Sequence, residues 1–354
     1  MLTIMAAAHF PAQRIKGSIR ICCGPTCPYK AYNLLMRTLE AVTVLFTCAV
    51  CGVGQVSQVS EGQHFNYDTG AAVHATEVSV QNRDDVAIHD ITYESSGGRT
   101  VPAYLVVPKG GGKFAAILWG HWLMPHSPSA NRSEFLDEAA ALASAGVVSL
   151  LIDTPQTRPG FVPEKKSFGP QTSELIAEQV VDLRRGVDLL LSRSDVDPKR
   201  IGYVGHSWDA RTGAILDAID KRLSAFVFMG GPISTRDNVL TSDTPNIVAM
   251  RKAVPADTLK TFLDTYAWAD AGAYATQLGP SAAFFQYALH DDFSPVVYAQ
   301  RYFDMAAGPK DVKFYDADHA LNAEARRDRF KFLQQHLAFQ NLPAGRLERV
   351  PAVK

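Results

Sequence analysis

The sequence predicts an α/β fold: a mostly parallel sheet covered by helices on both faces. Short apolar runs recur along the chain, and longer stretches with helical periodicity separate them. Continuous apolar runs are typical of strands buried on both faces, and intervening helices supply the crossovers that parallel strands need. We expect one such domain over residues 75–354.

The elements are expected in the following order. Two β-rich segments, Val86–Glu94 and Val101–Val107, flank turn residues at 95–99, which indicates an antiparallel hairpin at the sheet edge. Six further strands are expected at Phe114–Trp119, Val147–Ile152, Ile201–Val204, Ala225–Met229, Ala282–Ala288 and Val312–Tyr315. Helices are expected at Ser133–Ser144, Thr172–Leu191, Asp209–Arg222, Pro295–Met305 and Asn322–Ala338.

One interval breaks the alternation of strands and helices. Residues 232–280 carry four prolines and short helical patterns between two predicted strands. An insertion of this length is typical of a cap over a site, so we predict a helical cap there. A long irregular crossover is the alternative.

The first sixty residues differ from the rest. Residues 1–39 contain basic but no acidic side chains, an apolar run follows at Ala41–Val53, and polar residues come next. This order predicts a signal peptide within residues 1–60, with translation starting at Met1 or Met36. The run is shorter than the roughly 20 residues a membrane span needs. We therefore expect export to the periplasm or medium if the leader is cleaved, and a cytoplasmic or membrane-anchored chain otherwise.

Composition excludes several classes of protein. The formal net charge of −1 and the scattered basic residues argue against a nucleic-acid partner. All five cysteines lie at or before residue 51, so neither a disulfide framework nor a cysteine zinc site can hold the body together. The histidines do not have metal-ligand spacing, and we expect no metal and no cofactor. The oligomeric state cannot be deduced.

The strongest chemical signal is Ser207. The strand Ile201–Val204 leads through Gly205-His206-Ser207-Trp208-Asp209 directly into a helix. A serine at such a turn projects its hydroxyl above the sheet edge, where the helix amides face a developing oxyanion. This context favours a nucleophile over a serine that only caps the helix.

The chain resembles the α/β-hydrolase superfamily, and within it the dienelactone hydrolase and acetyl-xylan esterase branch. The similarity rests on the elbow at Ser207, on the opening segment 97–108 and on the strand order over about residues 85–340. The resemblance implies an α/β-hydrolase fold and a serine hydrolase without a cofactor. The superfamily pattern Gly-x-Ser-x-Gly has Asp209 here in place of the second glycine. That departure implies a relaxed elbow or lost activity.

The resemblance also implies an acid and a base that follow the serine in the chain. The pattern Gly-x-x-Asp-x-x-x-Pro aligns its acid with Asp291, with Asp292 as the rival one position later. His319, in the loop after the last predicted strand, stands where the general base is expected.

An oxyanion hole requires two amide donors. The Trp208 amide follows from the elbow, and the loop Gly120–Pro125 is expected to supply the other from Trp122, with His121 as the alternative. We expect the aromatic side chains of this loop to line a substrate pocket.

The sequence thus predicts a serine esterase that cleaves a small-molecule carboxylic ester with Ser207, Asp291 and His319. Two alternatives stay open. One is a catalytically silent scaffold that binds a ligand or partner, and the other is a peptidase or amidase that uses the same three residues.

Overall fold

The fold is built on one extended sheet. The computed structural model describes residues 61–83, 86–164, 169–342 and 345–353. Across these residues nine strands form a sheet in the order β1-β2-β3-β5-β4-β6-β7-β8-β9. The β1–β2, β2–β3 and β3–β5 pairs are antiparallel, and all other neighbours are parallel. The predicted α/β class, with a mostly parallel sheet, is therefore confirmed.

The elements have these bounds. The strands are β1 Ala75–Arg83, β2 Val86–Glu94, β3 Thr100–Pro108, β4 Phe114–Gly120, β5 Val147–Ile152, β6 Val196–His206, β7 Ala225–Met229, β8 Ala282–Ala288 and β9 Lys310–Tyr315. The α-helices are α1 Leu136–Ala143, α2 Gln171–Ser192, α3 Trp208–Ile219, α4 Thr235–Thr241, α5 Pro245–Ala253, α6 Ala256–Tyr266, α7 Val296–Met305 and α8 Ala323–Leu337. Short 3-10 helices are η1 Glu61–Phe65, η2 Ser96–Gly98, η3 Pro155–Thr157, η4 Ala267–Ala269 and η5 Ala271–Gln277.

The hairpin of β2 and β3 matches its predicted segments, but its predicted place at the sheet edge is wrong, because the unpredicted strand β1 pairs with the outer side of β2. All nine residues of β1 are exposed, so this strand has no buried face. Its side chains consequently lack the apolar pattern from which a half-buried strand is recognised. Backbone pairing with β2 places it in the sheet.

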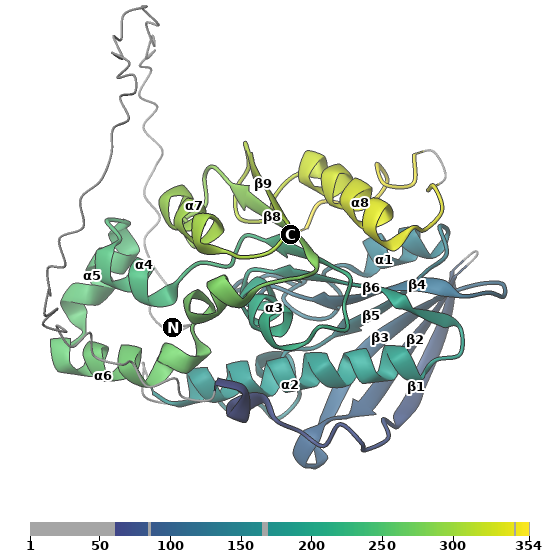
Figure 1. Cartoon of the computed structure of the whole chain (residues 1–354), viewed down its shortest axis with the longest axis horizontal. Helices are drawn as coiled ribbons and strands as arrows, with labels where there is room; N and C mark the ends of the chain where they lie inside the picture. Colours follow the sequence, from purple (N-terminus) through teal and green to yellow (C-terminus); the bar gives the residue numbers. More distant parts are fainter. Residues whose placement is uncertain (1–60, 84–85, 165–168, 343–344, 354) are drawn as a thin grey trace, which may run out of the picture. The chain divides into compact units, whose positions relative to one another are not determined.

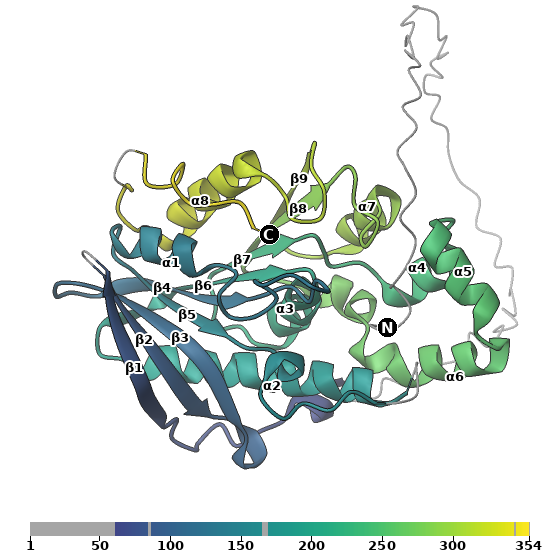
Figure 2. The ribbon, with the colours of Figure 1, turned by 180° about the vertical axis from the view of Figure 1, so that it is seen from behind.

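Helices cover the two faces of the sheet (Figures 1 and 2). Helices α2, α3 and α7 pack on the face that carries Leu118, Tyr203 and Phe226. Helices α1 and α8 pack on the opposite face, against Ile117 and Val204. Because alternate residues of one strand point to opposite faces, each central strand contributes to both cores.

The interval 232–280 is helical, as the sequence predicts. It contains α4, α5, α6, η4 and η5, and it lies at the opposite end of the molecule from β1 (Figures 1 and 2). Leu259 and Leu263 of α6 belong to the same core cluster as Ile176 and Val180 of α2. Its action as a cap over a site stays a prediction.

The predicted leader, residues 1–60, lies outside the described residues. Within the part of the chain that is described, no helix combines the length and the apolar character that a membrane crossing requires.

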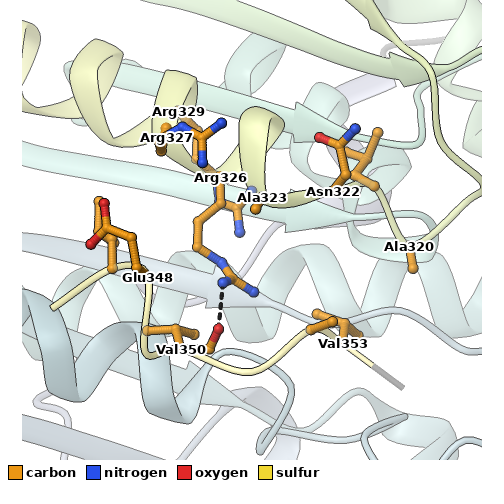
Figure 3. A pocket seen from close by; sticks show the side chains of 12 residues that line it. Ala320, Asn322, Ala323, Arg326, Arg327, Arg329, Glu348, Val350 and Val353 are labelled. Carbon is orange, nitrogen blue, oxygen red and sulfur yellow. Dashed lines mark hydrogen bonds between the residues drawn. The ribbon is translucent and has the colours of Figure 1, made fainter. Parts of the chain in front are cut away.

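A buried charge cluster joins α1 to α8 and to the C-terminal segment. Glu138 of α1, 2% exposed, accepts hydrogen bonds from Arg326 Nε at 2.9 Å and from the Arg329 guanidinium. Arg326 also donates from Nη1 and Nη2 to the carbonyl oxygens of Val350 and Pro351, at 2.7 and 2.6 Å. Arg326, Arg329 and Val350 are among the residues that line a cavity of about 210 Å³, and Figure 3 shows the Arg326–Val350 hydrogen bond there.

We expect Glu138→Ala to lower the free energy of unfolding by about 3–5 kcal/mol, because two buried arginines lose their counter-charge. The neighbouring Asp137 is a matched control: its side chain is 53% exposed and pairs with Arg83 at 3.4 Å. Asp137→Ala should cost less than about 1 kcal/mol. Urea unfolding of both variants checks this, and equal losses would contradict it.

Candidate active site

The centre of the site is the turn between β6 and α3. Ser207 joins these elements with φ 55° and ψ −103°, a backbone conformation that non-glycine residues rarely adopt. Its amide donates to the Met229 carbonyl oxygen at 2.7 Å, which fixes the turn to the end of β7. Such strain persists only where surrounding contacts enforce it, and it concentrates at functional sites.

Two glycines and a tyrosine enforce this turn. A Cβ on Gly205 would lie 2.2 Å from the Asp209 carbonyl oxygen, so only glycine fits there. The Tyr203 hydroxyl donates to that same oxygen at 2.6 Å. Gly213 leaves room for the tyrosine ring, since a Cβ on it would lie 2.2 Å from Tyr203 Cε1. The chain therefore bends around a buried tyrosine.

Asp209 occupies the position where a small residue was expected, and the facing strand makes room for it. Asp209 is completely buried against Gly120, the last residue of β4. A Cβ on Gly120 would lie 2.5 Å from both Cβ and Oδ2 of Asp209. The small residue of this contact is thus supplied by position 120, and the elbow keeps its bend without a glycine at 209.

The Asp209 carboxylate is well partnered. It accepts hydrogen bonds from Gln179 Nε2 at 2.9 Å, from Thr212 Oγ1 at 2.7 Å and from the His121 amide. Burial nevertheless raises its pKa to about 7, since these hydrogen bonds offset only part of the desolvation and the Glu134 charge adds to it. A titrating carboxyl group thus lies directly behind the elbow.

The predicted acid and base are in contact. His319 Nδ1 lies 2.7 Å from Asp291 Oδ2, and both side chains are buried. Asp292 is exposed. The structure thus pairs Asp291, and not its rival, with the histidine.

The surroundings of this pair set its charge state. Asp291 Oδ1 accepts the amides of Phe293 and Ser294 at 2.8 and 3.0 Å. Burial raises the pKa of Asp291, but the His319 contact and these amides outweigh it, so the net pKa lies below the ordinary value. Burial lowers the pKa of His319 below 6.5 by more than Asp291 raises it. At neutral pH the pair is a carboxylate and a neutral imidazole.

The serine and the histidine both lie close to the dipeptide Gly230-Gly231. A Cβ on Gly230 would lie 2.9 Å from His319 Cε1, and one on Gly231 would lie 3.4 Å from the Ser207 carbonyl oxygen. Ser294 Oγ donates to the Gly230 carbonyl oxygen at 2.8 Å, which ties the Asp291 loop to the same dipeptide. Ser207, His319 and the loop that carries Asp291 thus all lie near this dipeptide.

The two predicted oxyanion donors, the amides of Trp208 and Trp122, have different hydrogen-bond partners. Trp208 is the first residue of α3, where an amide has no acceptor within the helix. The Trp122 amide instead donates to Glu134 Oε2 at 2.7 Å, and the His121 amide donates to Asp209. The structure therefore does not support Trp122 as the second donor, because a buried carboxylate already takes its hydrogen.

The Trp122 side chain also differs from expectation. It is 3% exposed and stacks on the His206 ring, with centroids 4.9 Å apart, so most of the side chain is packed in the interior.

Sequence reasoning missed the roles of Glu134 and Arg211. Glu134 precedes α1 and is buried beside His206. Arg211, one turn into α3, hydrogen-bonds with Tyr266 of the insertion, and its charge contributes to the low pKa of His319. Neither has a signal in sequence, because an isolated charged residue in a helical pattern ordinarily faces solvent.

Within the described ranges, no group of three or more His, Cys, Asp or Glu side chains is arranged to hold a metal ion.

Comparisons with known proteins place the fold. No protein-family model and no curated protein matches the sequence. Among solved structures, an acetyl xylan esterase from Paenibacillus sp. R4 superposes with a TM-score of 0.65 at 19% identity, covering 78% of this chain and 92% of that one. Acetyl xylan esterase 1 from Thermoanaerobacterium sp. JW/SL YS485 gives 0.64 at 16% identity, with the same coverage. The 2,6-dihydroxy-pseudo-oxynicotine hydrolase gives 0.53 at 18% identity, covering 73% and 70%. The chain has the α/β-hydrolase fold.

The contact between Gly120 and Asp209 predicts a coupled pair of substitutions. Gly120→Ala should lower the free energy of unfolding by about 1–3 kcal/mol through overpacking. In an Asp209→Gly background the same change should cost at least about 1 kcal/mol less, because the atoms it meets are gone. Gly111→Ala, where a Cβ meets nothing within 4 Å, is the control. Additive losses in a denaturation cycle would contradict the coupling.

Proposed function

We propose that this protein is a serine hydrolase that cleaves carboxylic esters through an acyl-enzyme intermediate. The observation that carries the proposal is the buried His319–Asp291 contact of 2.7 Å beside the strained turn at Ser207. Fold likeness to esterases is consistent with it, but at below 20% identity that likeness concerns the fold.

The proposed steps follow from the proton positions. The Asp291 carboxylate accepts Nδ1–H of His319, which leaves Nε2 as the basic nitrogen. Nε2 removes the Ser207 hydroxyl proton while Oγ attacks the ester carbonyl carbon. The tetrahedral intermediate then expels the alcohol, which takes the proton from Nε2. Water, activated by the same nitrogen, hydrolyses the acyl-enzyme and regenerates the serine.

An oxyanion hole needs amide donors that have no other hydrogen-bond acceptor. The Trp208 amide at the start of α3 supplies one. For the second we propose the Leu123 amide, because the loop amides before it are taken and, among the described residues, Leu123 donates to none.

A small-molecule ester is the proposed substrate class. The two acetyl xylan esterases among the structural neighbours make acetyl esters the first substrates to try. Export through a cleaved leader stays a prediction, and the N-terminal residue of protein recovered from the periplasm or medium decides it.

A second candidate function is a ligand-binding scaffold without catalysis. It is favoured by one observation: the amides of both predicted loop donors, His121 and Trp122, are held by buried carboxylates. A fluorophosphonate probe separates the two, since only an activated Ser207 is labelled. A matched amide and ester of one acyl group separates an esterase from an amidase.

We expect Ser207→Ala and Asp291→Asn each to lower kcat for p-nitrophenyl acetate by about 10⁴-fold or more, because they remove the nucleophile and the group that sets the histidine tautomer. Asp292→Asn should stay within about twofold of wild type, since Asp292 is exposed. Undiminished hydrolysis by Ser207→Ala would overturn the proposal.

The pKa of His319 predicts the pH profile. The base must be neutral, and burial places its pKa below 6.5. The rate constant kcat/KM should therefore be constant at neutral pH and fall as the pH decreases through that lowered pKa. Initial rates in constant-ionic-strength buffers measure this limb. A midpoint above 6.5 would contradict the assignment of His319 as the base.

A further inference from the structure

A second histidine–carboxylate pair lies beside the first. His206, the last residue of β6, places its Nδ1 2.5 Å from Glu134 Oε1, and the exposed fraction of both side chains is 0%. Neither residue takes part in the proposed chemical steps. Burying an ionisable pair costs desolvation free energy unless its remaining donor and acceptor atoms are also hydrogen-bonded. The remaining atoms here are His206 Nε2 and Glu134 Oε2, and each contacts a group outside the pair.

The outer contact of His206 reaches the proposed base. Its Nε2 lies 2.9 Å from the His319 carbonyl oxygen. A carbonyl oxygen can only accept, so Nε2 carries a hydrogen. One proton then lies between Nδ1 and Glu134, whichever atom it is bonded to. The His319 residue is thus held twice: its ring by Asp291 and its backbone by His206.

The outer contact of Glu134 reaches another loop of the site. Glu134 Oε2 accepts the Trp122 amide at 2.7 Å, and the Trp122 ring stacks on His206 and lies nearly parallel to the His319 ring at 6.4 Å. The pair therefore links the loop after β4, the elbow and the histidine loop without touching Ser207 Oγ.

We propose that Glu134 and His206 are positioning residues, which hold the His319 backbone and the loop after β4 in register with Ser207. This inference rests on the proposed function and names two residues that it does not use.

The charges around His319 give an independent consequence. Asp291, His206 and Arg211 face its ring, and burial together with the His206 charge contributes to its low pKa. His206 in turn faces Glu134 and His121, and Asp209 faces Glu134. Replacing His206 by a neutral side chain therefore raises the pKa of His319, and moves the acid limb of kcat/KM to higher pH, only if the shared proton is bonded to His206 and not to Glu134.

Two substitutions at His206 separate positioning from simple stability. In His206→Gln the amide nitrogen stands near the place of Nε2 and can bond the His319 carbonyl, but Glu134 loses its partner. In His206→Asn the amide stands near the place of Nδ1 and keeps Glu134, but the His319 carbonyl loses its donor. Positioning predicts that the Asn variant is the more stable and the Gln variant the more active. We expect kcat of His206→Asn to fall about tenfold or more, with KM nearly unchanged.

Substitutions at Glu134 provide the second measurement. Glu134→Gln can donate to Nδ1 and still accept the Trp122 amide, so it should keep most of kcat, whereas Glu134→Ala should not. The control is His290→Gln: His290 pairs with Asp316 at 2.7 Å between the loops that carry Asp291 and His319, but both side chains are exposed. It should behave as wild type.

The outcomes decide as follows. Equal kcat in the Asn and Gln variants of His206, or wild-type kcat in Glu134→Ala, would each overturn the proposal. If wild-type Ser207 is neither labelled by fluorophosphonate nor active on esters, the proposed function fails separately. Amide hydrogen exchange then still tests positioning: residues 316–321 should exchange faster in His206→Asn than in His206→Gln, and equal rates would overturn it.

Discussion

The backbone of Ser207 is the constraint on which the rest of the site depends. A non-glycine residue with φ 55° keeps that conformation only if its neighbours allow no other. The Tyr203 hydroxyl restrains the turn by donating a hydrogen bond to the Asp209 carbonyl oxygen. Positions 205 and 213 are glycines because the bend and the tyrosine ring occupy the space that a Cβ would need. The Met229 carbonyl fixes the turn to the neighbouring strand. Everything placed around the serine is placed relative to this bend.

Buried carboxylates organise the surroundings of that turn. Asp291, Glu134 and Asp209 each leave water and regain hydrogen bonds from backbone amides of loops at the carboxyl ends of the strands. Because each acid serves a different loop, the loops are positioned by acceptors in the interior as well as by their own turns. The cost is that loop amides are consumed, which leaves few donors for an oxyanion. A loop amide that donates to a buried carboxylate fixes its loop, but the same amide cannot then donate to an oxyanion.

The sequence was sufficient to predict those strands whose apolar runs are clear, and the residues that directly follow them. Strands β5, β7 and β8 match the predicted bounds because apolar runs between breakers define a doubly covered strand. Ser207, Asp291 and His319 could be named because each follows a strand where the resemblance expects a site residue, and the structure brings Asp291 and His319 into contact. Strand β1 and the partners of Trp122 were not found. The first has no buried face, and the second depends on where Glu134, twelve residues away, directs one side chain. Pattern gives the position of a residue in an element, but the direction of a hydrogen bond comes from tertiary packing.

The contact between Gly120 and Asp209 also bears on how such chains diverge. A chain with glycine at both positions can accept aspartate at 209, and from then on any side chain at 120 collides with it. Aspartate at 209 therefore makes glycine at 120 obligatory, although position 120 could have varied before. A sequence motif that requires glycine two residues after the serine does not match chains that have aspartate there, as this one has at position 209. A motif that also allows aspartate there, provided that the facing strand ends in glycine as β4 does at Gly120, would match such chains.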